Sequence, residues 1–117
     1  MLFRSGYIPF VNILSTHTGT QIANGAIDAQ IRAYAHEFAA WSNGGQKRVF
    51  VGLLPEANGF WTVYHTGGSP DFIAAYRRIR SIFEDELAKA GAPSVAISWV
   101  FVPQGATNPP EDAFELW

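Results

Sequence analysis

The sequence predicts an α/β domain in which three parallel strands alternate with two helices, in the order β-α-β-α-β. Apolar runs typical of covered strands occupy residues 7–14, 49–54 and 95–102. Between these runs lie two stretches whose apolar residues recur at helical spacing. Strands that alternate with helices pair in parallel through right-handed crossovers. These observations together favour a parallel sheet covered by helices.

The first expected strand, residues 7–14, is apolar on both faces, as a covered parallel strand is. Residues 15–25 are polar and contain glycine, so we expect a loop there. A helix is expected over residues 26–42, where apolar residues form one stripe. The stripe consists of Ile27, Ile31, Tyr34, Ala35, Phe38 and Trp41. An Asn-Gly-Gly sequence at positions 43–45 ends this helix.

The second expected strand, residues 49–54, precedes a loop over residues 56–68 that is rich in glycine and aromatic residues. A strong helix start follows, with Ser69 as N-cap, Pro70 in the first helical position and Asp71 in the first turn. The buried stripe of this second helix consists of Phe72, Tyr76, Ile79, Phe83 and Leu87.

The second helix is expected to end at Gly91 and Pro93, ahead of a third strand over residues 95–102. A loop over residues 103–110 and the start of a short helix in residues 111–117 complete the expected elements. The sequence contains no internal repeat and no linker, and we therefore expect one domain over the whole chain.

Composition places the chain among globular domains. Its 117 residues are enough for one modest core, and 48% are hydrophobic while 15% are charged. Aromatic residues make up 15%. Such a content indicates either an unusually aromatic core or rings that serve a binding surface.

The charge pattern argues against nucleic acid and membrane partners. The net charge is −2, whereas nucleic-acid binding calls for a basic surface. The basic cluster Arg77, Arg78 and Arg80 precedes acidic residues, and a solvated helix face with pairs such as Arg80–Glu84 is the expected explanation. No apolar run is long enough to cross a bilayer, and no signal peptide is evident. Without cysteine, the sequence leaves the compartment open.

Functional residues are expected where the strands end. In parallel α/β folds the chemistry lies at the carboxyl ends of the strands. This rule brings the segment Ser15 to His17, the loop of residues 56–64 and Gln104 to one rim.

Glu56 is the most informative residue on that rim. It follows the apolar run 49–54 and Pro55, and Asn58 and Trp61 come shortly after it. A carboxylate, an amide and a flat aromatic face are what a sugar-cleaving site needs in one place. Tyr64 is equally consistent with stacking on a sugar and with core packing.

The segment Pro55-Glu-Ala-Asn-Gly-Phe-Trp61 resembles the acid/base segment of glycoside hydrolase family 26, the β-mannanase family. That family typically shows His-Glu-Met-Asn-Gly-x-Trp at the end of its fourth barrel strand. The flanking residues 25–35, 69–83 and 98–103 are also similar to the neighbouring helices and fifth strand of the family. The resemblance covers nearly the whole chain.

This resemblance implies a (β/α)8 barrel and retaining hydrolysis of β-1,4-mannan or a related β-glycan, without a cofactor. Glu56 matches the general acid/base, and Asn58 and Trp61 match substrate-binding positions. Pro55 stands where the family has His, and Gly52 where it usually has Arg. The chain matches only strands three to five, whereas complete barrels need roughly 250 residues. The resemblance therefore implies a partial barrel.

A retaining mechanism needs a second carboxylate about 5 Å from the first. The nucleophile of the family lies on a later strand, and nothing here matches it. Asp71 is better explained as a helix N-terminal charge. The other acidic candidates, which match no family position, are Glu111, Asp112 and Glu115. The isolated chain is therefore expected to be weakly active or inactive.

Two alternatives stay open beside the glycosidase interpretation. One is a non-catalytic module that oligomerises or binds carbohydrate, and the other is a small α/β binding domain in which Glu56 is structural. In either case the open sheet edges of a three-stranded unit favour self-association.

The remaining aromatic and histidine residues have simpler explanations. Trp99 and Phe101 share one strand face and are expected to pack against helices or fill a barrel interior. No metal site is expected, because His17 and His65 lack carboxylate partners at suitable spacing, and a loop hydrogen bond is the better explanation of each. His36 is expected at the surface or between helices.

Overall fold

The structure, a computed structural model, describes residues 7–57 and 61–103. Its elements are β1 (Phe10–Ile13), α1 (Gly19–Ala23), α2 (Asp28–Ser42), β2 (Val49–Leu53), the 3-10 helix η2 (Val63–His65), α3 (Gly68–Lys89), the 3-10 helix η3 (Ser94–Ala96) and β3 (Ile97–Val100). The strands form one parallel sheet in the order β1-β2-β3. The expected α/β class and parallel sheet are confirmed.

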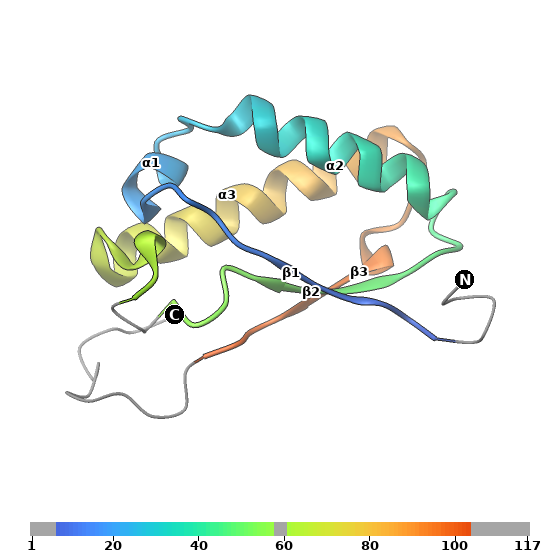
Figure 1. The fold of residues 1–117 in the computed structure, drawn as a ribbon. Helices are drawn as coiled ribbons and strands as arrows, with labels where there is room; N and C mark the ends of the chain where they lie inside the picture. Colours follow the sequence, from blue (N-terminus) through green and yellow to red (C-terminus); the bar gives the residue numbers. More distant parts are fainter. Residues whose placement is uncertain (1–6, 58–60, 104–117) are drawn as a thin grey trace.

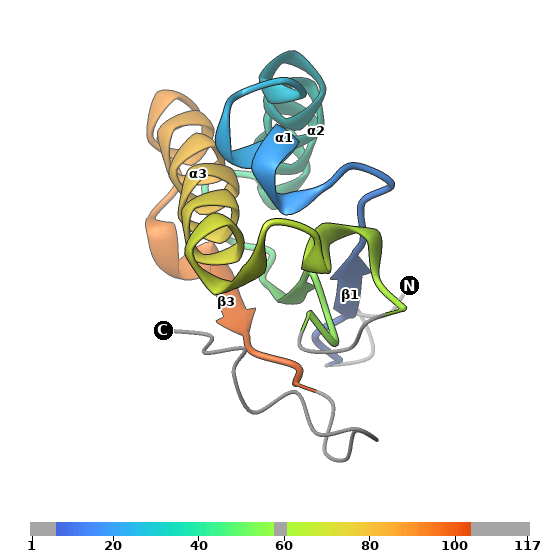
Figure 2. The same ribbon diagram turned by 90° about the vertical axis from the view of Figure 1, so that its left-hand side faces the viewer.

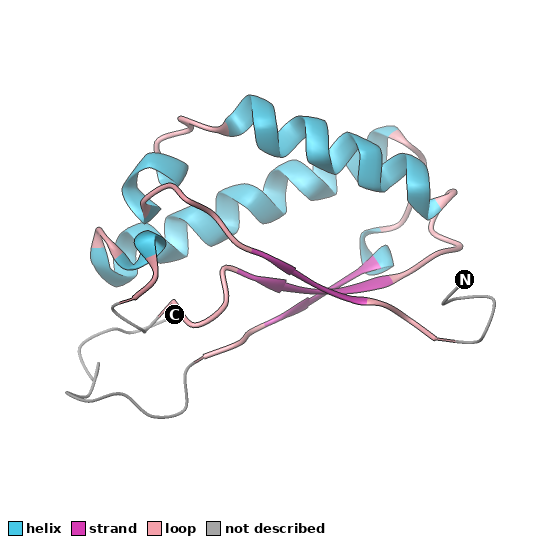
Figure 3. Cartoon of the chain, in the orientation of Figure 1, coloured by secondary structure: helices cyan, strands magenta, loops and turns pink. Residues whose placement is uncertain are grey.

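The helices lie on one face of the sheet. Figure 1 shows α2 and α3 side by side above the strands, and Figure 3 shows the sheet as a separate layer below them. In the described part of the chain no helix covers the opposite face. Figure 2 looks along the sheet toward the carboxyl ends of the strands, where α1 and η2 lie. None of the helices in the described ranges has the length and apolar character that a membrane span requires.

The core fills the space between the sheet and the two long helices. On the central strand Val49, Val51 and Leu53 are buried and face the helices. Phe50 and Gly52 alternate with them and therefore face the other side. The helix α3 contributes most of the opposing side chains through its buried residues Phe72, Ala75, Tyr76, Ile79, Ile82, Phe83, Glu86 and Leu87.

Aromatic rings join β3 to α3. The ring of Trp99 packs edge-on against Phe83 at 5.6 Å and against Tyr76 at 6.4 Å between centroids. Phe101 makes an edge contact with Phe72 at 6.3 Å. Edge-to-face pairs at these distances are favourable beyond the area they bury. The prediction that Trp99 and Phe101 pack against helices is confirmed.

The expected loop over residues 15–25 was wrong, because it contains the short helix α1. Thr18 is its N-cap and accepts a hydrogen bond from the backbone of Gln21, whose side chain binds the backbone of Thr18 in return. This reciprocal pair is a capping box, which satisfies two otherwise free N–H groups. The spacing Thr-x-x-Gln was the signal in the sequence.

Ser69 is not the N-cap of α3. The helix begins at Gly68 and its cap is Gly67, whose φ of 104° suits glycine. A Cβ on Gly67 would lie 2.4 Å from the Thr20 hydroxyl and 2.5 Å from the Asp71 carboxylate. Thr20 and Asp71 are themselves hydrogen-bonded, so α1 fixes the first turn of α3. Asp71 is an N-terminal charge, as expected.

Two further expectations need correction near the sheet edges. Tyr34 was expected in the buried stripe of α2, but it is 54% exposed and makes an edge contact with the Phe83 ring, at 6.2 Å between centroids. It lies on the side of β1, where it lines a pocket together with Ile13. The third strand begins at Ile97 rather than at position 95, because Val95 belongs to η3 and is exposed.

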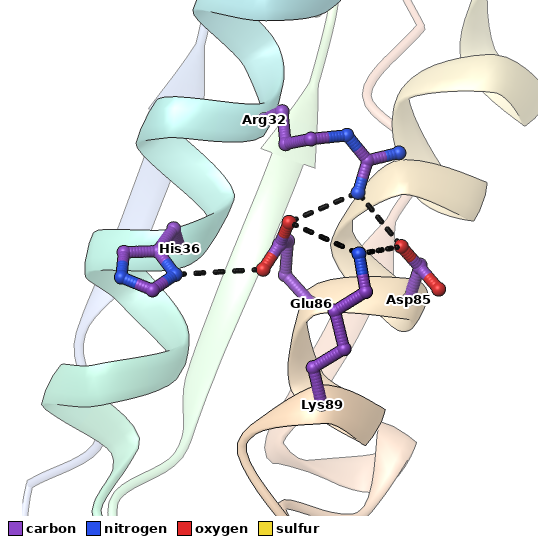
Figure 4. Close-up of polar contacts among 5 residues, drawn as sticks. All are labelled: Arg32, His36, Asp85, Glu86 and Lys89. Carbon is purple, nitrogen blue, oxygen red and sulfur yellow. Dashed lines mark hydrogen bonds and ion pairs between the residues drawn. The ribbon is translucent and has the colours of Figure 1, made fainter.

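Charged side chains connect α2 to α3, as Figure 4 shows. Arg32 of α2 lies 2.7 Å from Asp85 and 2.9 Å from Glu86 of α3. Lys89 binds Asp85 at 3.0 Å, and His36 lies 3.5 Å from the second oxygen of Glu86. The hydrogen bond from Arg32, with help from His36 and Lys89, lowers the pKa of Glu86. Glu86 is therefore buried as a compensated charge rather than an isolated one.

The basic cluster of α3 is only partly the solvated face that the sequence predicted. The pair Arg80–Glu84 forms as expected, at 3.0 Å. Arg78 instead reaches across to α2 and donates two hydrogen bonds, of 2.8 Å and 2.6 Å, to the carboxylate of Asp28. These bonds lower the pKa of Asp28. Arg78 thus fixes the N-terminus of α2 against α3.

We predict that Gly45→Ala destabilises the fold more than Gly44→Ala. Both glycines have positive φ, so alanine costs roughly 1 kcal/mol at either position. At Gly45 a Cβ would also lie 2.4 Å from Cδ of Pro93, whereas nothing lies within 4 Å at Gly44. We expect an additional loss of about 1–3 kcal/mol for Gly45→Ala, measured by urea unfolding. Equal losses of stability in the two variants would contradict the close approach of Gly45 to Pro93.

We predict that Glu86→Gln makes stability less sensitive to acid. Because the pKa of Glu86 is lower in the folded chain, its contribution is complete above its unfolded value near 4.5 and is lost as pH falls through the folded value. The variant should be less stable than the wild type at neutral pH and lose less stability in acid. Glu84→Gln is the control, since among the described residues Glu84 pairs with Arg80 of the same helix. Thermal unfolding across the acidic range gives the comparison, and parallel curves for wild type and Glu86→Gln would exclude the effect.

Candidate functional site

The chain turns sharply where the central strand β2 ends. Leu54 and Glu56 both have positive φ, 48° and 59°, a conformation that is uncommon outside glycine. Such residues cost of order 1–3 kcal/mol and persist only where the surroundings hold them. Leu54 is buried, and its N–H donates to the carbonyl of Ile13 in β1 at 2.8 Å. The turn is therefore attached to the neighbouring strand at its first residue.

Glu56 lies at the carboxyl end of the central strand, as the sequence predicted. Its N–H donates to the carbonyl of Val102, just beyond β3, at 2.6 Å. Its carboxylate accepts a hydrogen bond of 3.0 Å from the indole N–H of Trp61. In the described ranges no arginine or lysine forms an ion pair with this carboxylate. Glu56 is half-buried, so it is accessible to a ligand.

Tyr64 and His65 of η2 hold the backbone on either side of Glu56. Tyr64 is only 2% exposed, and its hydroxyl donates to the carbonyl of Pro55. Burial, with a smaller effect of the Glu56 charge, raises the pKa of Tyr64 to about 12, so the hydroxyl keeps its proton at neutral pH. Nδ1 of His65 lies 2.8 Å from the carbonyl of Ala57. The loop hydrogen bond expected for His65 is therefore present.

Glu56 and Tyr64 line a cleft of about 610 Å³ at the carboxyl end of the sheet. Its polar and aromatic walls come from the end of β1 and the residues after it, from the turn after β2, and from the segment that leads into η2; these residues are Asn12, Ser15, Thr16, Glu56, Trp61, Thr62 and Tyr64. The side chain of Trp61 is 47% exposed, so part of its ring faces solvent. The cleft therefore combines one carboxylate, one amide, several hydroxyls and an aromatic face.

The structure brings some of the predicted site residues together. Glu56 and Trp61 are hydrogen-bonded to each other, while Tyr64 lies behind them with almost no exposed surface to stack on a sugar. Asn58 and Gln104 lie outside the described residues. Of the expected rim residues in the first loop, Ser15 and Thr16 line the cleft.

Of the other acidic candidates, only Asp71 belongs to the described residues, and it does not line this cleft. Asp71 is in the first turn of α3, where it binds the Thr20 hydroxyl. Glu111, Asp112 and Glu115 lie outside the described residues. Glu56 is the only acidic residue among the described residues that line the cleft. Nor do the described residues contain a group of three or more histidines and acids placed to hold a metal.

The sequence interpretation missed Asn12, which pairs in register with Gly52. A Cβ on Gly52 would lie 2.3 Å from Oδ1 of Asn12 and 3.2 Å from the ring of Phe10. Glycine at this position therefore leaves room for the Asn12 amide beside the cleft. The signal was a single polar residue inside an otherwise apolar strand.

Comparisons with known proteins do not assign the chain to a family. No protein-family model and no curated protein matches it. The resemblance of residues 55–61 to family 26 therefore remains an interpretation of the residues themselves.

Proposed function

We propose that the chain is part of a family 26-like (β/α)8 barrel that hydrolyses β-1,4-mannan or a related β-glycan with retention, with Glu56 as the general acid/base. The main support is the place of the Glu56 carboxylate, at the carboxyl end of the central parallel strand and beside the half-exposed ring of Trp61. Active sites of (β/α)8 barrels lie at this end of the strands.

In this proposal Glu56 first protonates the glycosidic oxygen while a second carboxylate bonds to the anomeric carbon and the leaving sugar departs. Glu56 later removes a proton from the water that attacks this carbon and releases the second carboxylate. The indole N–H of Trp61 orients the carboxylate, while the exposed part of the ring offers a flat face to the C–H groups of a sugar. Asn58 would bind a sugar hydroxyl, as the resemblance implies. Tyr64 is assigned a supporting position, because its ring is buried.

The proposal requires a second carboxylate that the described part of the cleft does not contain. A retaining enzyme needs one roughly 5 Å from Glu56. In a complete barrel it would come from a later strand, and the uncovered face of the present sheet, with Phe10 and Phe50, would line the barrel interior. We therefore expect the isolated chain to bind a glycan more readily than it cleaves one.

A non-catalytic carbohydrate-binding module is the second candidate. The single acidic residue lining the described part of the cleft favours it, because binding needs the aromatic face and the hydrogen-bonding groups but no nucleophile. A third possibility, a purely structural Glu56, is consistent with its hydrogen bond to Trp61. The three functions give different results in one set of assays.

We predict that the chain binds mannan, glucomannan or mixed-linkage glucan through Trp61. Loss of the ring in Trp61→Ala should weaken binding about tenfold, the equivalent of roughly 1.4 kcal/mol, measured by calorimetry with soluble oligosaccharides. Any hydrolysis, followed by reducing-sugar release, should fall by about 10²–10⁴ in Glu56→Gln. Tyr34→Ala is the matched control, because Tyr34 is a similarly exposed ring outside this cleft.

The outcomes separate the candidates. Hydrolysis abolished in Glu56→Gln supports the enzyme, and binding without hydrolysis that is lost in Trp61→Ala supports the binding module. If none of these glycans binds or is cleaved, the saccharide interpretation fails and Glu56 is structural.

Self-association through the open edge of β1 is the second part of the proposal. Exposed apolar side chains gather on this side of the sheet, where Tyr7 is 66%, Phe10 52% and Leu14 66% exposed. The whole segment 7–14 is uncharged, so two copies can approach without repulsion between like charges. We therefore expect a second copy of the chain to cover this edge.

We predict a mass above the 12.8 kDa of the monomer by light scattering at micromolar concentration. Phe10→Lys should shift the chain toward the monomer, because a charge on an edge strand opposes pairing. Val95→Lys is the control on the other side of the sheet, at a residue that is 60% exposed. A monomeric wild type would refute the proposed association.

A further inference from the structure

Both backbone carbonyls that flank Glu56 are bound by consecutive side chains of η2. The Tyr64 hydroxyl donates to the carbonyl of Pro55, and Nδ1 of His65 lies 2.8 Å from the carbonyl of Ala57. Between them the Glu56 N–H donates to Val102 at 2.6 Å. The backbone is therefore held before, at and after the carboxylate-bearing residue.

This backbone needs such support because of its conformation. With φ of 59°, Glu56 is in the left-handed region, which a non-glycine residue leaves unless its surroundings prevent it. A return to negative φ would turn the Cα–Cβ bond and move the carboxylate away from the indole of Trp61. The contacts on both sides oppose this rotation.

The supporting hydrogen bonds are partly shielded from water, because Tyr64 is 2% exposed and Ala57 is 3% exposed, while Pro55 and His65 are half-buried. A partly buried carbonyl that loses its donor is poorly compensated by water, so each bond favours the observed turn. A carbonyl oxygen only accepts hydrogen bonds, and Nδ1 of His65 therefore holds the proton in this contact.

We propose that Tyr64 and His65 are positioning residues that fix the direction of the Glu56 carboxylate by holding the carbonyls of Pro55 and Ala57. We call these two contacts the Glu56 clamp. The inference rests on the proposed function only for what Glu56 does to a sugar, since the clamp itself is defined by backbone and side-chain contacts.

The first test measures the geometry of Glu56 without any glycan. Glu56→Gln should shift the indole N–H resonance of Trp61, which is assigned by its absence in Trp61→Phe, because this N–H binds the Glu56 carboxylate. In Tyr64→Phe, which keeps the ring and removes the hydroxyl, adding Glu56→Gln should shift the resonance much less. Tyr76→Phe is the matched control, because Tyr76 is equally buried but lies in α3.

A second pair of variants tests the other contact and covers the case in which Tyr64→Phe fails to fold. His65→Ala removes the donor to Ala57 and should also abolish the shift at Trp61. His65→Asn places an amide N–H near the position of Nδ1 and should restore it. Wild-type behaviour in both Tyr64→Phe and His65→Ala would overturn the proposal.

The second readout separates this inference from the proposed function. If the wild type cleaves glycan, Tyr64→Phe should lower the rate by roughly 10²-fold through misplacement of the carboxylate, with a smaller effect on glycan binding. If the wild type neither binds nor cleaves glycan but the Trp61 shift still depends on Tyr64 and His65, the clamp stands and the proposed function fails. If cleavage occurs and neither Tyr64→Phe nor His65→Ala lowers the shift or the rate, the clamp fails alone.

Discussion

The left-handed turn after β2 is the constraint on which the site depends. Two non-glycine residues, Leu54 and Glu56, have positive φ within three positions. The turn is bound to β1 through Ile13, to the chain beyond β3 through Val102, and to η2 through Tyr64. Since β1 and the chain beyond β3 each accept a hydrogen bond and η2 donates two, the direction of the Glu56 side chain depends on the assembly of all three strands, although the residue itself belongs to none of them.

Within the described ranges, helices cover one face of the sheet, while the other face and the edge at β1 expose apolar side chains. Rings such as Trp99 fill the core between the sheet and the helices, and exposed ion pairs such as Arg78–Asp28 join α3 to α2. On the side of β1, Phe10 and Tyr34 remain exposed, and the backbone edge has no neighbouring strand in the described part of the chain. The three strands and two long helices share a core that orders them. The uncovered sheet face and the edge at β1 are the surfaces on which the proposed further β-α units or second copy would pack.

The sequence predicted those features that depend on local periodicity. The stripe of α2 and its end at Asn43, which has the left-handed conformation, follow from residues close in the chain. Features set by distant contacts were missed. Gly67 replaced Ser69 as the cap because Thr20, far away in sequence, binds Asp71. In the site, the rule that function lies at the carboxyl ends of parallel strands placed Glu56 correctly. The hydrogen bond from Tyr64 could not be predicted, because its acceptor is a backbone carbonyl, which every residue has.

Most side chains that hold Glu56 in place lie close to it in the sequence. This matters for which features of an active site a partial barrel, as proposed, could retain. Trp61, Tyr64 and His65 follow Glu56 within nine positions, and together they bind its carboxylate and both flanking carbonyls. A nucleophile on another strand would need its own supports, because a retaining mechanism depends on the separation of two carboxylates. The geometry of the proposed acid/base is therefore set within the three strands and η2, whereas in the proposed barrel the distance between the two carboxylates would be set by closure of the barrel. A chain with three strands can preserve the first property in full while lacking the second, which is why binding and side-chain orientation, rather than turnover, are the measurements closest to what this structure determines.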